Sequence, residues 1–247
     1  MERVDGMRKR DKACCAGNNP LIGILMLNTA FKRIPGDIGN PRTFKFPVLY
    51  ETIQAANPDK VVVDADHSLV SEFVEGAQKL ERKGVKAITT SCGFMAIFQD
   101  ELREEINTPI FTSSLLQVPM ISKMLRKGEK VGVITADSRY LTKKHLESVG
   151  ITDDMKVVIS GMEPQEYFKQ VYADKPIKSI DAVKDEIEQE LVVVANGLLK
   201  GNPDVREVVL ECTNLPPFAG ALRKSLNVPI FDVVSLTNLV HEALCRP

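Results

Sequence analysis

The chain has 247 residues, of which 44% are hydrophobic and 26% are charged, so it is long enough for one large α/β domain or two lobes of roughly 100–150 residues. Its formal net charge of −1 gives no electrostatic reason to expect a nucleic acid or an anionic membrane as partner. No segment reaches the ~18 consecutive apolar residues that a membrane span requires.

From residue 21 onward, short apolar runs typical of buried strands alternate with segments of helical periodicity. The strands expected in the first half are residues 22–27, 61–63, 85–90 and 109–111, with helices at 68–82, 94–106 and 115–127. Those expected in the second half are 131–135, 157–159, 205–210 and 229–231, with helices at 141–149, 180–199, 217–226 and 235–244. This alternation predicts parallel sheets joined by right-handed crossovers.

An internal duplication relates the two halves. A shift of 120 positions (212 − 92 = 120) aligns Cys92 with Cys212 and the run Pro109–Phe111 with Pro229–Phe231 without a gap. Val85, Phe98, Leu102, Arg103 and Asn107 also fall on identical residues, where chance would give roughly one or two identities over such a window. The duplication predicts two pseudo-symmetric, doubly wound α/β lobes with parallel sheets and an active site in the cleft between them.

We therefore expect three regions along the chain. Residues 1–20 form a polar N-terminal tail, whose basic run at 8–12 is typical of a solvated terminus. Residues 21–128 form the first lobe, joined by the C-terminal helix 235–247, and residues 129–234 form the second. Five cysteines without framework spacing predict free thiols and a reducing, cytoplasmic location.

Cys92 and Cys212 each follow a predicted strand, 85–90 and 205–210, and each precedes a helical segment. Ligands of such sheets bind at the carboxyl ends of the strands, and a helix N-terminus favours a thiolate. Two thiols facing each other across a cleft could remove a proton from one face of a carbon and return one to the other. They are therefore the candidate catalytic residues.

Groups that could bind a substrate carboxylate surround the two cysteines. The backbone N–H groups of Gly93 and Thr213 could stabilise an enediolate, and Gly93 would let the backbone approach a ligand closely. The side chains of Ser91, Thr213 and Asn214 add possible donors.

The loop at 35–40, after the first strand, has strong turn chemistry. It is either a simple turn or the segment that brings Asp37, together with Asn28, into the cleft. Glu211 adjoins Cys212, but neighbouring strand residues face opposite ways, which favours a supporting role for this carboxyl. The three histidines, His67, His145 and His241, show neither metal-ligand spacing nor a triad pattern, so no metal is expected.

The segments at 88–94 (ITTSCGF) and 210–214 (LECTN) resemble the two cysteine motifs of the aspartate/glutamate racemase superfamily. That group includes amino-acid racemases, hydantoin racemases, maleate isomerases and arylmalonate decarboxylases. The likeness extends from about residue 21 over nearly the whole chain and includes the strands that begin at 22–25 and 131–134. It implies two α/β lobes, no pyridoxal phosphate or other cofactor, no metal, and frequently a homodimer or higher homo-oligomer.

By this resemblance, Cys92 and Cys212 form the base and acid pair, and Thr213 matches a residue that helps to bind the substrate carboxylate. Two positions depart from the amino-acid racemases, which usually have Asn after the first cysteine, where this chain has Gly93. They often have His or Glu two residues after the second, where this chain has Asn214.

The function predicted from the sequence is cofactor-independent racemisation or epimerisation of a small carboxylate, with an acidic amino acid as the best match, through α-proton transfer between thiolate and thiol. Two alternatives within enzymes are cis-trans isomerisation of an unsaturated diacid such as maleate, by covalent addition of a cysteine, and racemisation of a hydantoin. A protein that binds a small acid without turnover is the alternative from another class.

Overall fold

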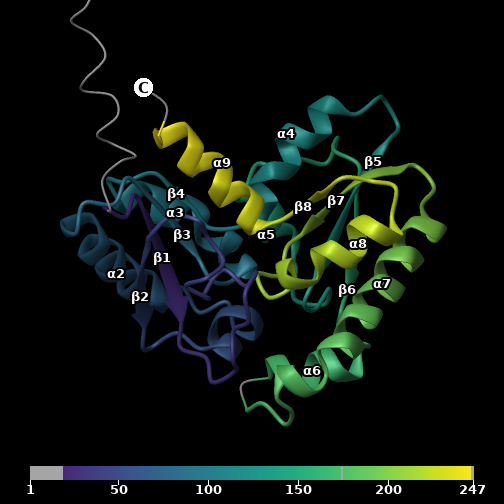
Figure 1. Cartoon of the computed structure of the whole chain (residues 1–247). Helices are drawn as coiled ribbons and strands as arrows, with labels where there is room; N and C mark the ends of the chain where they lie inside the picture. The colour runs from purple at the N-terminus through teal and green to yellow at the C-terminus, as the bar shows by residue number, and fades with distance from the viewer. Residues whose placement is uncertain (1–18, 174, 246–247) are drawn as a thin grey trace, which may run out of the picture.

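The computed structural model describes residues 19–173 and 175–245 of the chain. It contains two four-stranded parallel sheets with strand orders β2-β1-β3-β4 and β6-β5-β7-β8, each flanked by helices (Figure 1). The two orders are the same when β5 is matched to β1, β6 to β2, β7 to β3 and β8 to β4. The predicted fold class, two pseudo-symmetric α/β lobes with parallel sheets, is thereby confirmed.

The first sheet is built from chain segments between residues 22 and 111. Its strands are β1 (Ile22–Leu27), β2 (Val48–Ile53), β3 (Ala87–Thr90) and β4 (Ile110–Phe111). The α-helices of this half are α2 (Val70–Arg82), α3 (Gln99–Glu105) and α4 (Gln117–Met124). Shorter helical turns are η1 (Asp59–Val63), η2 (His67–Leu69), η3 (Gly93–Phe98) and η4 (Ser114–Leu116).

The second half repeats this arrangement. Its strands are β5 (Lys130–Thr135), β6 (Val157–Gly161), β7 (Val205–Leu210) and β8 (Ile230–Phe231). Its helices are α5 (Lys143–Glu147), α6 (Glu166–Tyr172), α7 (Lys184–Gly201) and α8 (Ala219–Ser225), with short turns η5 (Ile180–Ala182) and η6 (Pro216–Phe218). The chain continues into α9 (Val233–Cys245).

The prediction of a strand at 61–63 is wrong. These residues belong to the π-helical turn η1, which follows the helical backbone of Pro58. The edge strand of the first sheet is instead β2, which escaped detection because it is only half-buried and carries the charged Glu51 within its short apolar run. An edge strand needs no continuous apolar sequence, since it is not covered on all sides.

Helix α9 packs on the first lobe. Its residues Val233 and Leu236 join a buried cluster with Ile22 and Ile24 of β1 and with Phe111 of β4. Figure 1 shows this helix, in yellow, returning from the end of β8 toward the first sheet. Helix α9 therefore packs against strands from the first half of the chain.

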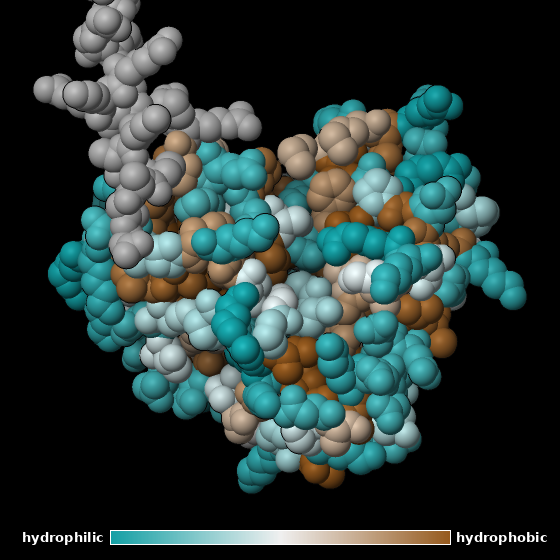
Figure 2. Space-filling view, viewed as in Figure 1, coloured by the Kyte–Doolittle hydropathy of each residue, from teal (hydrophilic) through white to brown (hydrophobic). Residues whose placement is uncertain are grey.

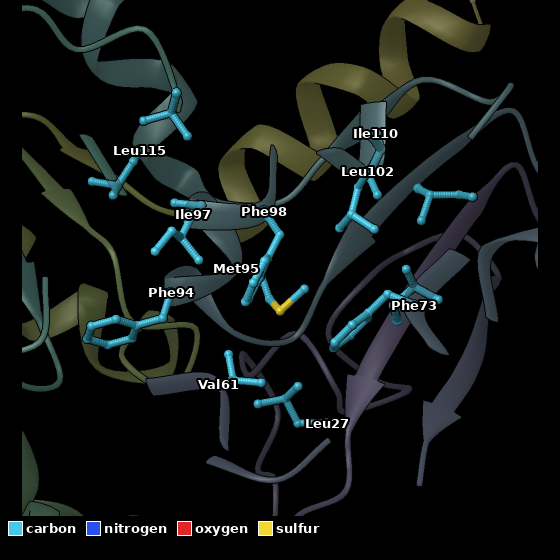
Figure 3. Close-up of a cluster of buried hydrophobic side chains, with 14 of the residues drawn as sticks. Leu27, Val61, Phe73, Phe94, Met95, Ile97, Phe98, Leu102, Ile110 and Leu115 are labelled. Carbon is cyan, nitrogen blue, oxygen red and sulfur yellow. The ribbon is translucent and has the colours of Figure 1, made fainter. Parts of the chain in front are cut away.

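The largest buried cluster runs through both lobes rather than stopping at their boundary. It joins Phe94 and Leu115 of the first lobe to Val133 and Val209 of the second. All six residues of η3 are buried, and Figure 3 shows Phe94, Met95, Ile97 and Phe98 of this turn within the cluster. The segment that follows Cys92 is thus held by packing on both sides, which fixes the position of its backbone.

Hydrophilic residues cover most of the face drawn in Figure 2, with hydrophobic residues in smaller groups among them. None of the helices in the described part of the chain is both long enough and apolar enough to cross a membrane.

Candidate active site

Both candidate catalytic cysteines line one cavity between the two lobes. The cavity has a volume of about 90 Å³, and one water occupies roughly 10–15 Å³ of such space, so a molecule of about six to nine non-hydrogen atoms fits. The lining residues are Leu27, Thr29, Phe31, Arg33, Pro58, Val62, Ser91, Cys92, Gly93, Phe94, Ala136, Phe168, Tyr172, Cys212, Thr213 and Asn214. The two cysteines that the duplication aligns therefore share one partly open cavity of this size.

The parallel sheets bring the two thiols together. Cys92 lies two residues after β3 and has an extended backbone, with φ −148° and ψ 124°, at the start of η3. Cys212 follows β7, the strand that occupies the matching position in the second sheet. Because each strand is central in its sheet and delivers its cysteine at the carboxyl end, both side chains reach the same cleft.

Two hydroxyls expected to bind substrate instead form hydrogen bonds with backbone groups of the protein. The Thr213 hydroxyl donates a 2.6 Å hydrogen bond to the backbone carbonyl of Ser91, which links the two cysteine-bearing loops across the lobes. The Ser91 hydroxyl accepts a 2.9 Å hydrogen bond from the backbone N–H of Leu27. Both residues line the cavity, but the Thr213 hydroxyl already donates its hydrogen to the Ser91 carbonyl of the first lobe.

Gly93 is required by the neighbouring lobe. A Cβ atom at this position would overlap both the backbone carbonyl and the carboxyl oxygen Oε1 of Glu211. The prediction that glycine allows the backbone to approach a ligand is therefore incomplete: the close approach is to Glu211. Gly93 also lines the cavity, so the same contact brings the Glu211 carboxyl next to the segment that carries Cys92.

Asp37 does not line the cavity, contrary to the expectation that it meets the substrate there. It is buried and accepts hydrogen bonds of 2.8 Å from the guanidinium of Arg33, from the backbone N–H of Gly39 and from the side-chain amide of Asn214. The residue that faces the cavity is Arg33. Because its charge is already paired with Asp37, the guanidinium is held in a fixed position.

Asn28 is also misplaced by the sequence prediction. Its side chain is exposed and donates to the carbonyl of Gln54, at 3.3 Å, while the next residue, Thr29, lines the cavity. Asn214 does line it, and its carbonyl oxygen accepts a long hydrogen bond from the Cys212 thiol, with 3.7 Å between sulfur and oxygen.

The thiols are less acidic than the sequence suggested. Burial, with the negative charge of Glu211 as the second cause, raises the pKa of Cys92 to about 12 and that of Cys212 well above its usual value. Backbone N–H groups of η3 and the charge of Arg33 oppose the rise at Cys92. The expectation that a helix N-terminus lowers both pKa values fails because η3 and η6 are short 3-10 turns in an enclosed site, where the loss of hydration disfavours a thiolate.

Aromatic side chains form much of the remaining wall. Phe31 and Tyr172 meet edge to face with ring centroids 5.1 Å apart, and the centroid of Phe168 lies 4.9 Å from that of Tyr172. Phe94 completes the aromatic lining. No Asp or Glu lines the cavity, and Arg33 is its only cation, among the residues that the structure describes. In the same part of the chain no cluster of three or more His, Cys, Asp or Glu is arranged to hold a metal ion.

Comparison with known families decides which family this architecture represents. The model of the Asp/Glu/hydantoin racemase family matches residues 50–238, a range that includes both cysteine motifs. The chain belongs to this family. The resemblance inferred from the two motifs is confirmed.

Solved structures share the racemase fold over most of the chain. Glutamate racemase from Francisella tularensis, in complex with D-glutamate, has a TM-score of 0.53 and 17% identity, covering 93% of this chain and 84% of that one. Unliganded arylmalonate decarboxylase has a TM-score of 0.56 and 14% identity, covering 92% of each chain. At these identities the likeness concerns the racemase-family fold and not the reaction.

Curated relatives of this racemase-family chain are named as lyases and not as racemases. A protein called dimethylsulfoniopropionate lyase 5, from Emiliania huxleyi, is 30% identical over 98% of this chain, which covers 48% of that protein. A dimethylsulfoniopropionate lyase from Durusdinium sp. clade D is 26% identical over 86% of this chain, which covers 71% of the relative. The chain therefore spans about half of the first relative's length.

Three residues that line the cavity, Arg33, Phe168 and Tyr172, were not predicted from the sequence. Arg33 stands between charged and apolar residues in a loop, with no motif around it. Phe168 and Tyr172 lie on α6, a seven-residue helix that was not predicted. The one available signal was their spacing of four residues, which places two aromatic rings on the same face of a helix.

Proposed function

We propose that the chain is a lyase that cleaves dimethylsulfoniopropionate, or a closely related β-sulfonio carboxylate, by β-elimination. The observation behind this proposal is the match, over nearly the whole chain, to proteins named dimethylsulfoniopropionate lyase. The substrate has about eight non-hydrogen atoms, within the range that the cavity volume allows.

The groups that line the cavity suit both ends of such a substrate. A carboxylate pairs favourably with the guanidinium of Arg33, whose planar fork suits two parallel hydrogen bonds. A sulfonium cation is attracted to the faces of aromatic rings, which Phe31, Phe168 and Tyr172 supply. An acidic amino acid would need a second cation for its side-chain carboxylate, and the described lining offers none besides Arg33.

In the proposed reaction, Cys92 as thiolate takes a proton from the carbon next to the carboxylate. The electron pair of the broken C–H bond forms the double bond of acrylate, and the bond between the β-carbon and sulfur breaks. Dimethyl sulfide leaves with that electron pair as a neutral molecule, so the leaving group needs no proton. Cys92 then returns its proton to solvent.

Two features favour Cys92 over Cys212 as the base. The Cys212 thiol donates its proton to Asn214, which stabilises the protonated form. The charge of Arg33 acts in favour of the thiolate at Cys92, whereas the charge of Asp37 acts against it at Cys212. The positive sulfonium group of a bound substrate would lower the pKa of the nearby thiol further, so the base would form mainly in the complex.

A racemase remains the second candidate, because two thiols from matching strands line one cavity and a carbon between them could exchange its proton from either face. In that case the protein would exchange the α-proton of an amino acid without releasing a thioether. The maleate and hydantoin reactions stay predictions from the resemblance alone.

The deciding experiment supplies the purified protein with dimethylsulfoniopropionate and measures dimethyl sulfide by gas chromatography and acrylate by proton NMR. The two products should appear in equal amounts, and Cys92→Ala should abolish both. A parallel panel of aspartate, glutamate, a hydantoin and maleate in deuterated water tests for exchange or isomerisation. If an amino acid loses its α-proton signal while the sulfonium compound stays intact, the chain is a racemase and not a lyase.

A further inference from the structure

Glu211 is a buried carboxyl that no step of the proposed elimination uses. Its side chain is fully buried, and its oxygen Oε2 accepts a 2.7 Å hydrogen bond from the hydroxyl of Thr135 on β5. The other oxygen, Oε1, has no hydrogen-bond partner in the described part of the chain. A buried carboxyl oxygen without a partner is uncommon in folded proteins and calls for a physical explanation.

The carboxyl lies next to both thiol-bearing segments. Glu211 directly precedes Cys212, and its Oε1 packs so closely on Gly93 that this position has no room for a Cβ atom. Gly93 in turn follows Cys92. One carboxyl from the second lobe therefore adjoins the cysteine loop of each lobe, and its negative charge acts against ionisation of both thiols.

No cation balances this carboxyl among the ion pairs of the described residues. Arg33 acts on Cys92 but is bonded to Asp37. His145 of α5 packs edge to face on Phe94, and burial lowers its pKa to about 4, so it is neutral at physiological pH.

The acidic groups of the adjoining loops have partners of their own. Asp137, after β5, pairs with Arg139, and Glu163, after β6, accepts a hydrogen bond from the Ser138 hydroxyl. Glu211 is therefore left with the two thiols as the titratable groups whose charge responds to its own.

We propose that Glu211 is a positioning residue that controls when a thiolate can form. The site holds one uncompensated negative charge, either on Glu211 or on a thiol. Glu211 therefore takes up a proton when Cys92 loses one. Two negative charges so close together in a poorly hydrated site disfavour each other. Burial raises the pKa of Glu211 to about 7, so this carboxyl changes charge near neutral pH. The inference deepens the proposed function and depends on it only for the use of a thiolate.

The test measures thiol ionisation without any substrate. The rate at which iodoacetamide alkylates Cys92 is followed across neutral pH, with the modified peptide identified by mass spectrometry, in the parent and in Glu211→Gln. Below about pH 6 the two rates should agree, because Glu211 is then protonated in the parent, and above about pH 8 the variant should react faster. A thiol pKa lower by one unit gives tenfold more thiolate, partly offset by weaker nucleophilicity, so we expect a gain of about three- to fourfold.

Two further variants separate this role from a purely structural one. Glu207→Gln, in β7 just before Glu211, removes a carboxyl whose pKa is also raised by burial but which does not act on the thiols, so Cys92 should react as in the parent at every pH. Thr135→Val removes the stronger of two hydrogen bonds that lower the pKa of Glu211; the other, from the backbone of Ala136, remains. In this variant Glu211 should ionise at a higher pH than in the parent, so the slowing of Cys92 alkylation should also begin at a higher pH.

The outcomes distinguish the two proposals. A Glu211→Gln protein that folds, releases dimethyl sulfide and alkylates at the parent's rate at all pH values overturns the role of Glu211 and leaves the elimination standing. A rate ratio that differs from one but does not change with pH also overturns it, since only titration of the carboxyl produces the expected profile. The expected profile in a protein that releases no dimethyl sulfide overturns the lyase reaction alone.

Discussion

Replacing Arg33 by Met tests whether the buried ion pair beside the cavity supports both the fold and the substrate. The Arg33 guanidinium and the Asp37 carboxylate are 2.8 Å apart, with 9% and 1% of their side chains exposed. Methionine keeps much of the aliphatic stem and removes the charge, so Asp37 stays buried with only the Asn214 amide and the Gly39 N–H as partners. Removal of one member of a buried pair typically costs about 3–5 kcal/mol, which is roughly 6–20 °C in Tm for a chain of this size.

A second substitution separates stability from binding. Asp37→Asn in the Arg33→Met background removes the unpaired charge, so the free energy of unfolding in guanidinium chloride should return most of the way to the parent value. The KM for dimethylsulfoniopropionate should stay high in the double variant, because the cation proposed for the carboxylate is still missing. A single variant as stable as the parent would refute the buried-pair reasoning, and a double variant with the parent's KM would refute the binding role.

Three further predictions concern packing, pH and the aromatic wall. Gly93→Ala should lower the free energy of unfolding by about 1–3 kcal/mol, because the new methyl meets the backbone carbonyl of Glu211. Gly197→Ala in α7, where nothing lies within 4 Å, should instead raise it by about 0.5–1 kcal/mol. Urea unfolding of both variants checks the contrast. Burial raises the pKa of Glu211 in the folded protein to about 7 from its ordinary value of 4.5, so the stability that its protonation contributes is present below about pH 4.5 and lost as the pH rises through 7. The free energy of unfolding of Glu211→Gln, measured relative to the parent, should therefore be about 3 kcal/mol more favourable to the folded state at pH 8 than at pH 4.5. The same difference at both pH values would contradict the shifted pKa. Titration of His145 affects variant and parent alike, so it cancels in this comparison. Phe168→Leu should raise the KM for the sulfonium substrate about two- to thirtyfold in steady-state assays, through loss of a cation–π contact, and an unchanged KM would place the sulfonium elsewhere.

The sequence was sufficient to predict how the sheets deliver the two cysteines. The duplication aligned Cys92 with Cys212, and the rule that ligands bind at the carboxyl ends of parallel strands placed both at one cleft. These inferences succeeded because β3 and the last three residues of β7, 208–210, are fully buried apolar or β-branched runs that end just before the cysteines. The half-buried edge strand β2 offered no such run and was missed.

The polar groups around the thiols could not be assigned from the sequence. Whether Asp37 faces a ligand or an internal partner depends on where the loop at 35–40 folds back, and the deciding contact, with Asn214, joins residues 177 positions apart. The same limit applies to the thiol pKa values. A helix N-terminus can be recognised from the sequence, but the depth of burial and the nearness of Glu211 arise only when the lobes close on each other.

The two reactions considered for this cavity make different demands on the pair of thiols. Racemisation needs a base on one face of the carbon and an acid on the other, with both roles exchangeable, which favours two equivalent cysteines. Elimination of a sulfonium group needs one base and no acid, because dimethyl sulfide leaves uncharged. Here the surroundings of the two thiols are unequal, since Cys212 donates to the Asn214 side chain and is opposed by the charge of Asp37, while the charge of Arg33 favours the Cys92 thiolate. Asn214→Ala should therefore leave elimination by Cys92 largely intact, whereas a two-base racemase would lose the group that holds the proton of its Cys212 thiol. Measuring dimethyl sulfide release by this variant distinguishes the two mechanisms. A loss comparable to that of Cys92→Ala would contradict a one-base mechanism.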